Sequence, residues 1–454
     1  MAKTIAAVAT GNSVSGIGVI RISGDNAIEI ADKVFKAVDG TPLSSLKGYT
    51  AKFGNVCCDG ESFDNAVALV FRNPKSYTGE DVVELSVHGG IFIVEKTLEA
   101  VFSAGAVPAQ AGEFTKRAFL NGKIDLAQAE GVAALISAQG QEAAKASFNL
   151  LQGSLSNKIS QVLDELINCS ASMAAWVDYP DEEIPDLEEN TLKEILENSA
   201  ASLSELLKNY ENGAVMTQGV DTAIVGRPNA GKSTLMNMLS GAQKSIVTHI
   251  EGTTRDIVEN SVRLSNLVLH LSDTAGIRES DDLVESIGIK KAIDKINSAS
   301  LILAVFDSSD TLNDDDQMLI ESCKGKPCVA VVNKTDLQSK IDLSHIKAHF
   351  DKIVYLSAKN NEGADDLEKA VKELLGVENF DSSQPILANQ RQKLCVSNAY
   401  NYICQAIDGA QMGITYDAIN VMIDSAVDDL LTLTGKKATE EVVNNIFSRF
   451  CVGK

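Results

Sequence analysis

The stretch that decides the fold is VDTAIVGRPNAGKST, residues 220–234. A short apolar run leads into the pattern G-x-x-x-x-G-K-S, in which the glycines are Gly226 and Gly231. Because glycine lets the backbone pass close to phosphate groups, successive N–H groups of such a loop point toward them. Lys232 then reaches the β- and γ-phosphates, and the Ser233 hydroxyl reaches Mg²⁺. The sequence therefore predicts a strand, a phosphate-binding loop and a helix whose N-terminus faces the anion.

Four further segments follow this loop in the order of a guanine nucleotide-binding domain. TTRD (253–256) offers a threonine hydroxyl for Mg²⁺, and DTAG (273–276) offers an aspartate and a glycine N–H that senses the γ-phosphate. NKTD (333–336) ends in a carboxylate that accepts from N1–H and the exocyclic amine of guanine, a donor pair that adenine lacks. SAK (357–359) follows the last expected strand. Five elements in this order predict a Ras-like α/β domain that binds GTP, with a β-hairpin over residues 256–273.

The residue after DTAG bears on GTP hydrolysis. Signalling GTPases of this type have glutamine there to orient the attacking water, whereas this chain has Ile277. No arginine finger in cis is evident from the sequence, although Arg255 and Arg278 lie near these motifs. Hydrolysis therefore needs another acid to orient water, for which Glu279 and Glu285 are candidates, and another positive charge against the transition state.

A bound monovalent cation would supply that charge. Asn229 in the phosphate-binding loop and the segment VTHIEGT (247–253) offer side-chain and carbonyl oxygens suited to such an ion. From spacing alone, the simpler interpretation is that Asn229 is an ordinary loop amide and that Glu279 and Glu285 are surface acids.

Length and composition predict several domains in a reducing compartment. A chain of 454 residues is longer than one core supports, so about two to four domains are expected. The eight cysteines contain no C-x-x-C pair and are accompanied by only five histidines, which disfavours structural zinc. The apolar runs are too short to span a membrane, and the N-terminus lacks a signal-peptide pattern. We therefore expect a cytoplasmic protein without a membrane span.

The net charge of −22 argues against bulk nucleic-acid binding. Residues 1–120 hold 11 basic and 13 acidic side chains, a net charge of −2, so the remaining residues carry −20. If the chain contacts RNA, its N-terminal part or a partner protein is the better surface.

The N-terminal part, residues 1–118, predicts an α+β domain. Short β-like runs (TIAAVAT, GVIRIS, AKFGNV, AVALVF and VVELSVHGG) accompany two helical stretches, at residues 27–38 and 92–105. Polar clusters around Arg21, Glu84 and Lys123 indicate no more than a candidate site for an anionic ligand, since each residue also fits a solvated strand face or a turn.

Helical periodicity covers residues 124–215 and resumes after Pro385. Two prolines and four acids interrupt it at residues 178–185, where we expect a solvated turn rather than a metal site. Neither half is a complete bundle, so we infer one helical domain interrupted by the nucleotide-binding domain.

The whole chain resembles the MnmE (TrmE) family of tRNA modification GTPases. The resemblance is carried by GVIRISG (18–24), SYTGEDVVELSVHGG (76–90), GEFTKRAFLNGKIDLAQAE (112–130), DYPDEEI (178–184), GRPNAGKST (226–234), IVTHIEGTTRD (246–256), DTAGIR (273–278) with VESIGI (284–289), NKTD, LSAK (356–359) and FCVGK (450–454). One departure concerns the loop before GVIRISG, which is often of the Pro-Pro-Gly-Arg type in the family and is TGNSVSG (10–16) here. This departure affects the details of that loop, which the resemblance places near a bound folate.

The resemblance implies a multidomain α/β plus all-α architecture. Residues 1–118 would form an α+β folate-binding domain that also dimerises. Residues 119–215 and 381–454 would form a discontinuous helical domain, and residues 216–380 the inserted Ras-like P-loop GTPase domain.

The resemblance also implies site residues. A tetrahydrofolate derivative, 5-formyl- or 5,10-methylene-tetrahydrofolate, would be bound by Arg21, Glu84, Lys123 and Lys454. Mg²⁺ would be held by Ser233 and Thr254, and K⁺ by Asn229, Thr248, Ile250 and Thr253, so that K⁺ stands where an arginine finger would. Glu285 would place the attacking water, which removes Glu279 as a candidate; Lys232 and Cys451 complete the catalytic set, although Cys451 equally fits a small packed residue.

The GTP-binding residues implied in the same way are Asn229, Ala230, Gly231, Lys232, Ser233, Thr234, Thr248, His249, Ile250, Glu251, Gly252, Thr253, Thr254, Asp273, Thr274, Ala275, Gly276, Asn333, Lys334, Asp336, Ser357, Ala358 and Lys359.

The function implied is that of a K⁺-stimulated GTPase homodimer working with the flavoprotein MnmG in a hetero-oligomer. Together they would form an aminomethyl-type group, typically carboxymethylaminomethyl, at carbon 5 of the wobble uridine of tRNA, with a tetrahydrofolate one-carbon unit. The alternative is a ribosome-assembly or signalling GTPase switch, which the GTPase motifs alone fit equally well. The folate-like N-terminal part and the FCVGK terminus favour the tRNA-modifying function.

Overall fold

The computed structural model describes residues 3–11, 13–138, 140–178, 189–241, 261–264, 267–271, 296–297, 299–378 and 380–454. These residues divide into two compact units. The first contains the described residues of Met1–Ala133 and Asp428–Lys454, and the second those of Ala134–Thr248 and Asp256–Val427. The domain limits expected from the sequence stay a prediction.

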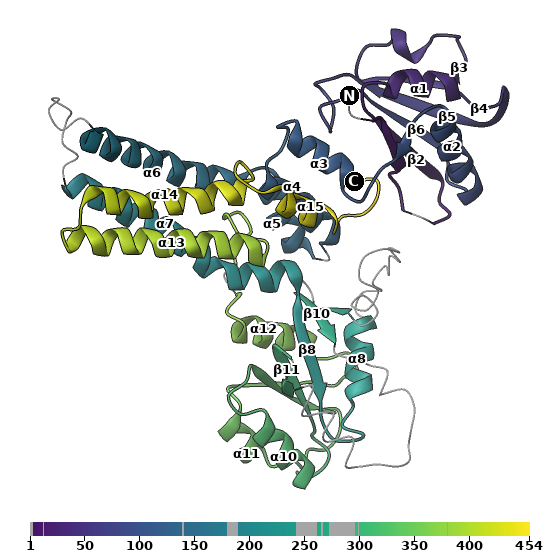
Figure 1. The fold of residues 1–454 in the computed structure, drawn as a ribbon. Coiled ribbons are helices and arrows are strands. Elements are labelled where there is room, and N and C mark those ends of the chain that lie inside the picture. Colours follow the sequence, from purple (N-terminus) through teal and green to yellow (C-terminus); the bar gives the residue numbers. More distant parts are fainter. Residues whose placement is uncertain are drawn as a thin grey trace. The chain divides into compact units, whose positions relative to one another are not determined.

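A seven-stranded sheet forms the core of the first unit (Figure 1). Its strand order is β3-β4-β5-β6-β2-β1-β7, and every neighbouring pair is antiparallel except β1 with β7. The helices α1 (Ala27–Val34) and α2 (Ile91–Ser103) share one apolar cluster with the sheet. The strands are β1 (Ile5–Val8), β2 (Ile17–Ser23), β3 (Phe35–Ala37), β4 (Thr50–Cys58), β5 (Glu61–Phe71), β6 (Val82–His88) and β7 (Val107–Pro108).

The helix expected over residues 27–38 is shorter than predicted. It ends at Val34, and Phe35–Ala37 form β3, in which Phe35 lies opposite Val56 of β4. Phe35 has an extended backbone and a buried side chain. Burial in the sheet core therefore overrides the local helical periodicity, which is a weak determinant by itself.

The C-terminal segment belongs to the first unit. Helix α15 (Glu440–Phe447) packs on α3 (Glu113–Leu120), where the ring centroids of Phe119 and Phe447 are 6.2 Å apart. Beyond α15 the chain forms a β-bridge between Val452 and Ala111. The last residues are thereby fixed beside the N-terminal sheet.

Long helices form one part of the second unit. Helix α7 (Glu189–Gln218) packs against α13 (Gln390–Gln411), although the nucleotide-binding domain separates the two in the sequence (Figure 1). This pairing confirms the discontinuous helical domain. The second unit also contains α5 (Gln141–Leu151) and α6 (Ser154–Asp178), whereas α4 (Leu126–Ser137) and α14 (Tyr416–Thr434) have residues in both units.

A second sheet, of order β13-β12-β11-β8-β10-β9, carries the nucleotide motifs. Among the described strands of this sheet, only β9 is antiparallel to its neighbour, which confirms the expected hairpin with β10. The elements are β8 (Val220–Val225), α8 (Lys232–Gly241), β9 (Ser261–Leu264), β10 (Leu267–Leu271), β11 (Leu301–Asp307), α10 (Asp314–Ser322), β12 (Cys328–Asn333), α11 (Leu343–His349), β13 (Lys352–Tyr355) and α12 (Ala364–Leu374).

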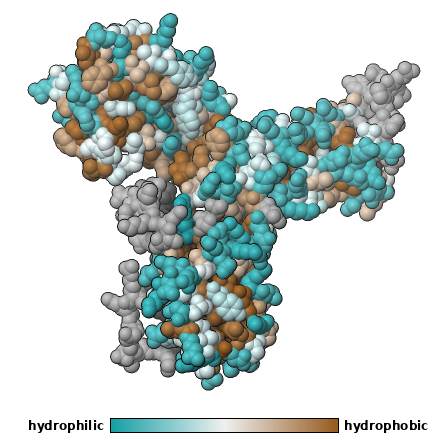
Figure 2. Space-filling model, turned by 180° about the vertical axis from the view of Figure 1, so that it is seen from behind, coloured by the Kyte–Doolittle hydropathy of each residue, from teal (hydrophilic) through white to brown (hydrophobic). Residues whose placement is uncertain are grey.

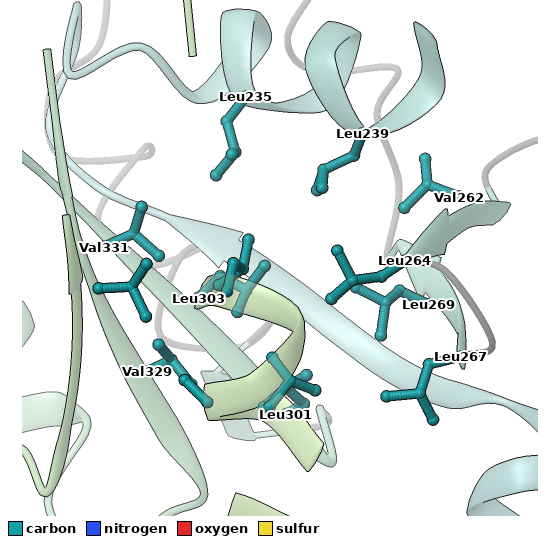
Figure 3. Packing of buried hydrophobic residues seen from close by; sticks show 14 of the residues in the cluster. Leu235, Leu239, Val262, Leu264, Leu267, Leu269, Leu301, Leu303, Val329 and Val331 are labelled. Atoms are coloured by element: carbon teal, nitrogen blue, oxygen red, sulfur yellow. The ribbon is translucent and has the colours of Figure 1, made fainter. Parts of the chain in front are cut away.

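Both faces of this sheet are covered, so its central strands are apolar throughout. Leu301, Leu303 and Val305 of β11 join one core cluster, and the alternate residues Ile302 and Phe306 join another. Figure 3 shows the first cluster, in which Leu235 and Leu239 of α8 point toward the strands. Period-two alternation between two buried faces is the arrangement of parallel sheets, whose strand ends carry the site.

Candidate functional site

The phosphate-binding loop connects β8 to α8, as the sequence predicts. Its backbone has positive φ at three residues, Gly226 (158°), Asn229 (63°) and Gly231 (95°). A Cβ on Gly231 would lie 2.2 Å from Nδ2 of Asn333, so only glycine permits this close approach. Ser233 and Thr234 lie exposed at the N-terminus of α8, the end of a helix that favours anions.

Lys232 is held inside this loop. Its Nζ donates to the carbonyl oxygens of Gly226 and Arg227, at 2.8 Å each. Burial lowers the pKa of the Lys232 ammonium from its ordinary value. Among the described residues its acceptors are neutral carbonyls, and a partly desolvated ammonium of this kind is a suitable partner for a phosphate, whose charge would compensate for the lost hydration.

Asn333 joins three of the predicted motifs. Its side chain is buried, and its Nδ2 donates to the carbonyl oxygen of Ala230 at 3.1 Å. Its Oδ1 accepts from the backbone N–H groups of Lys334 at 2.8 Å and Ala358 at 3.1 Å. One amide thus connects the phosphate-binding loop, NKTD and SAK, and sets the spacing between the phosphate and base sites.

The carboxylate of Asp336 is prepared for a guanine base. The Ser357 hydroxyl donates to Oδ1 of Asp336 at 2.7 Å and holds the pKa of that carboxyl below its ordinary value, with smaller contributions from Lys359 and Lys334. Asp336 is exposed. An ionised carboxylate that is fixed through one oxygen and open to solvent can accept from the two N–H donors of guanine.

The other predicted nucleotide and cation ligands lie outside the described residues, and their roles stay predictions. They are Thr248, His249, Ile250, Glu251, Gly252, Thr253, Thr254, Asp273, Thr274, Ala275, Gly276 and Glu285.

A second polar cluster lies on the sheet of the first unit. Arg21 of β2 and Glu84 of β6 are register partners, and Nε of Arg21 donates to Oε1 of Glu84 at 2.8 Å. The Arg21 guanidinium carbon lies 5.6 Å from the ring centroids of both Tyr77 and Phe114. Burial raises the pKa of Tyr77, whose hydroxyl is hydrogen-bonded to Thr115 at 2.9 Å.

The C-terminus reaches this cluster. Nη1 of Arg21 donates to the carbonyl oxygen of Gly453 at 3.4 Å, and the N–H of Phe114 donates to that of Lys454 at 3.2 Å. Gly453 has a φ of 98°, and a Cβ on it would lie 2.2 Å from the carbonyl oxygen of Val8. Burial, together with the charge of Arg21, lowers the pKa of the Lys454 ammonium.

Lys123 and Cys451 lie at the edges of the cluster. Nζ of Lys123 donates to the carbonyl oxygen of Pro74 at 3.0 Å, on the segment that leads to Tyr77. Lys123 also lines a hollow of about 750 Å³ between the regions of α3 and α15. The Cys451 carbonyl accepts from Gly112 at 3.3 Å, and the Cys451 side chain is half-buried. The structure thus brings Arg21, Glu84 and Lys454 together, with Cys451 near Lys454. Lys123 contacts the segment before Tyr77 and lines a hollow that includes none of the other three folate candidates.

Sequence reasoning missed several residues of these sites. The rings of Tyr77 and Phe114 lie beside the Arg21 guanidinium, and Glu80 binds Arg117 through both carboxylate oxygens at 3.1 Å. All four residues lie inside the motifs 76–90 and 112–130, but no spacing rule predicts which side chains of two different elements will meet. Among the described residues, no group of three or more His, Cys, Asp or Glu side chains could hold a metal ion. No helix in the described part is long and apolar enough to cross a membrane.

The fold and the nucleotide site define a P-loop protein of the guanine nucleotide-binding class. The family model "GTP-binding protein TrmE N-terminus" matches residues 4–123, and "MnmE helical domain" matches residues 126–451. The tRNA modification GTPase MnmE of Clostridioides difficile is 37% identical, and that of Lachnoclostridium phytofermentans 39% identical, each over 99% of both chains. The chain therefore belongs to the MnmE family.

A further relative, the tRNA modification GTPase MnmE of Listeria innocua, is 38% identical over 99% of both chains. Among solved structures, Era in complex with MgGDPNP and a segment of 16S ribosomal RNA is 28% identical and covers 40% of this chain and 66% of its own, with a TM-score of 0.26.

Proposed function

We propose that this chain is a cytoplasmic, K⁺-stimulated GTPase that acts with the flavoprotein MnmG on tRNA. The pair would form an aminomethyl-type group, typically carboxymethylaminomethyl, at carbon 5 of the wobble uridine. The observation that carries the proposal is the family membership: relatives named tRNA modification GTPases match along 99% of the chain.

In the nucleotide site, the backbone of the phosphate-binding loop and Lys232 would hold the phosphates, and Asp336 would select guanine. The exposed Ser233 hydroxyl and Thr254 would hold Mg²⁺, and Asn229 would contribute to a K⁺ site with Thr248, Ile250 and Thr253. Positive charge on these ions stabilises the charge that develops on the transferred phosphoryl group. Glu285 would orient the attacking water.

The Arg21–Glu84 cluster suits a tetrahydrofolate derivative. The Glu84 carboxylate is a suitable acceptor for the N–H donors of a pterin ring, and Tyr77 and Phe114 make its surroundings aromatic. Lys454 and Lys123 are suitable cations for the carboxylates of the folate tail. Bound there, the folate would supply the one-carbon unit. These contacts support Arg21, Glu84 and Lys454 as folate residues, and Lys123 stays a prediction from the sequence.

The first unit offers a surface for homodimer formation. Phe53 and Val67 are cross-strand partners of β4 and β5, and both are exposed, whereas the alternating residues face the core with α1 and α2. Figure 2 shows hydrophobic side chains gathered on the surface of the N-terminal part. Exposed apolar surface of this kind marks an interaction site.

The test is nucleoside mass spectrometry of tRNA from cells of the source with and without the gene. We expect the 5-aminomethyl-type wobble uridines to disappear on deletion and to return with the intact gene but not with a Lys232→Ala copy. A Lys347→Ala copy, altered at an exposed lysine of α11, serves as the matched control. Unchanged wobble uridines in the deletion strain would indicate a ribosome-assembly or signalling switch instead.

The cation assignment has its own test. GTP turnover should be much faster in KCl than in NaCl, and equal rates would remove the K⁺ site. The Glu285→Ala variant should bind nucleotide normally and lose turnover; normal turnover would exclude Glu285 as the group that orients water.

A further inference from the structure

Arg227, the second residue of the phosphate-binding loop, is engaged outside that loop. Its side chain is 11% exposed, and Nη2 lies 2.9 Å from Oδ2 of Asp310. Nη1 donates to the carbonyl oxygen of Thr311 at 3.4 Å and lies 3.7 Å from Oδ2 of Asp316. The guanidinium therefore binds the connection between β11 and the start of α10.

Asp316 is the buried end of this contact. It is 2% exposed and forms a capping box at the N-terminus of α10, in which Oδ2 accepts from the N–H of Asn313 at 3.2 Å. Its Oδ1 is buried and has no hydrogen-bond partner among the described residues. Because an ionised carboxylate with few donors is costly to bury, the charge of Arg227 is needed at this position.

The other end of the connection is fixed as well. Asp307, the last residue of β11, forms an ion pair with Lys334 of NKTD, with Nζ 2.6 Å from Oδ2. The Ser308 hydroxyl donates to the Lys334 carbonyl oxygen at 2.8 Å. The connection between β11 and α10 is therefore anchored to the base motif and can hold Arg227 in place.

The backbone of Arg227 bears directly on Lys232. The Arg227 carbonyl oxygen accepts from Nζ of Lys232 at 2.8 Å and from the N–H of Ala230 at 3.3 Å. A movement of Arg227 would therefore displace both the phosphate-binding ammonium and the turn that arranges the loop N–H groups.

We propose that Arg227 is a positioning residue for nucleotide binding: its side chain ties the phosphate-binding loop to Asp310 and Asp316 and thereby sets the affinity for GDP and GTP. The inference rests on nucleotide binding and not on the folate or tRNA chemistry. It assigns to Arg227 no contact with the nucleotide, since both of its terminal nitrogens are engaged with the β11–α10 connection.

The test compares Arg227→Met, Arg227→Lys, Asp310→Asn and the double variant Arg227→Met/Asp310→Asn in the full chain. The control is Lys324→Met, which removes an exposed ion pair with Glu321 on α10. Dissociation constants are measured for fluorescent N-methylanthraniloyl GDP and for the corresponding non-hydrolysable GTP analogue. The ratio of GDP to IDP affinity is measured as a readout of the base site, because the base of IDP lacks the exocyclic amine of guanine.

Arg227→Met should weaken the binding of both nucleotides by the same factor, roughly 3- to 30-fold, which is the size of effect that residues without ligand contact have on coupling between sites. The GDP/IDP ratio should stay constant, and Arg227→Lys should recover part of the affinity. Asp310→Asn should weaken binding less, about threefold, and Arg227→Met should cost less in its background because the pair is already broken.

Two results would overturn the proposal. Dissociation constants for Arg227→Met within about twofold of the control, with a lowered melting temperature, would show a purely structural role. Full additivity of Arg227→Met and Asp310→Asn would show that Arg227 acts on the nucleotide without Asp310. If Arg227→Met does not fold, the dissociation constants of Asp310→Asn, at an exposed side chain, and of the conservative Arg227→Lys are compared with the control instead. Values within about twofold of the control for both variants would overturn the proposal.

Discussion

Replacing Asn333 by alanine removes one side chain that connects three nucleotide-binding motifs. The substitution deletes the donor to Ala230 and the acceptor for Lys334 and Ala358. It leaves the buried carbonyl of Ala230 and the buried N–H of Ala358 without these partners. At about 1–3 kcal/mol for each buried group left unsatisfied, we expect a loss of about 2–5 kcal/mol in the free energy of unfolding of the nucleotide-binding domain.

Differential scanning calorimetry of the full chain measures this loss. The transition of the nucleotide-binding domain is the one that added GDP shifts to higher temperature, because a ligand stabilises the state that binds it. For a domain of this size, the expected loss lowers the midpoint by roughly 5–15 °C. GDP affinity, measured in the same samples by fluorescence, should fall at least tenfold because the phosphate-binding loop is released from the base motif.

Two further variants make the result specific. Asn333→Asp keeps the acceptor for Lys334 and Ala358 but places a buried carboxylate oxygen against the Ala230 carbonyl, so it should lose at least as much stability as alanine and bind GDP poorly. Asn297→Ala removes an exposed amide that accepts from Lys326 and should change the midpoint by less than about 2 °C. A midpoint and a GDP affinity of Asn333→Ala equal to those of this control would refute the reasoning.

Three other substitutions test separate parts of the structure. Gly453→Ala places a Cβ 2.2 Å from the Val8 carbonyl oxygen at a φ of 98°, so the C-terminal segment must shift. In calorimetric titration the variant should bind 5-formyltetrahydrofolate at least tenfold more weakly and GDP normally. An unchanged affinity for folate would show that the C-terminus is not part of that site. Ser357→Ala removes the donor that lowers the pKa of Asp336, so the pKa of this carboxyl should rise. Because the carboxylate accepts from guanine only above its pKa, GDP affinity should begin to fall at a higher pH on acidification than in the unaltered chain. The same pH dependence of GDP affinity in both proteins would contradict this account. Glu80→Gln removes the charge that pairs with Arg117 and should lower the free energy of unfolding by about 1–3 kcal/mol. This is measured in the urea-induced transition that GDP does not shift. An unchanged midpoint would show that Glu113 alone is enough to pair with the Arg117 charge.

The nucleotide site could be predicted well from the sequence because its parts are local. A strand, a glycine-containing loop and a helix in immediate succession leave few conformations open, and the loop follows β8 as expected. The carboxyl ends of parallel strands meet at one edge of the sheet, so the order of the motifs also predicts that NKTD and SAK lie beside that loop. What could not be predicted is the Asn333 amide that joins all three.

The pairing of Arg227 with Asp310 and Asp316 shows the limit of such reasoning. Arg227 stands inside the most recognisable motif of the chain, yet its partners lie more than 80 residues away on another element. Periodicity and spacing describe one element at a time and contain no rule for which side chains of two elements meet. The same holds for Phe35, whose place in β3 depends on Val56 of β4.

The sequence by itself determined the GTP-binding motifs, the alternation of buried strands and the helical nature of the flanking segments. Each of these depends on residues a few positions apart, whose relative geometry is set by backbone sterics and side-chain periodicity. Only the tertiary structure decided that α7 packs on α13 and that Gly453 meets Arg21 across 432 residues. Such contacts follow from the packing of whole elements, and because the entropy of closing a loop grows only slowly with its length, sequence separation says little about which residues will touch.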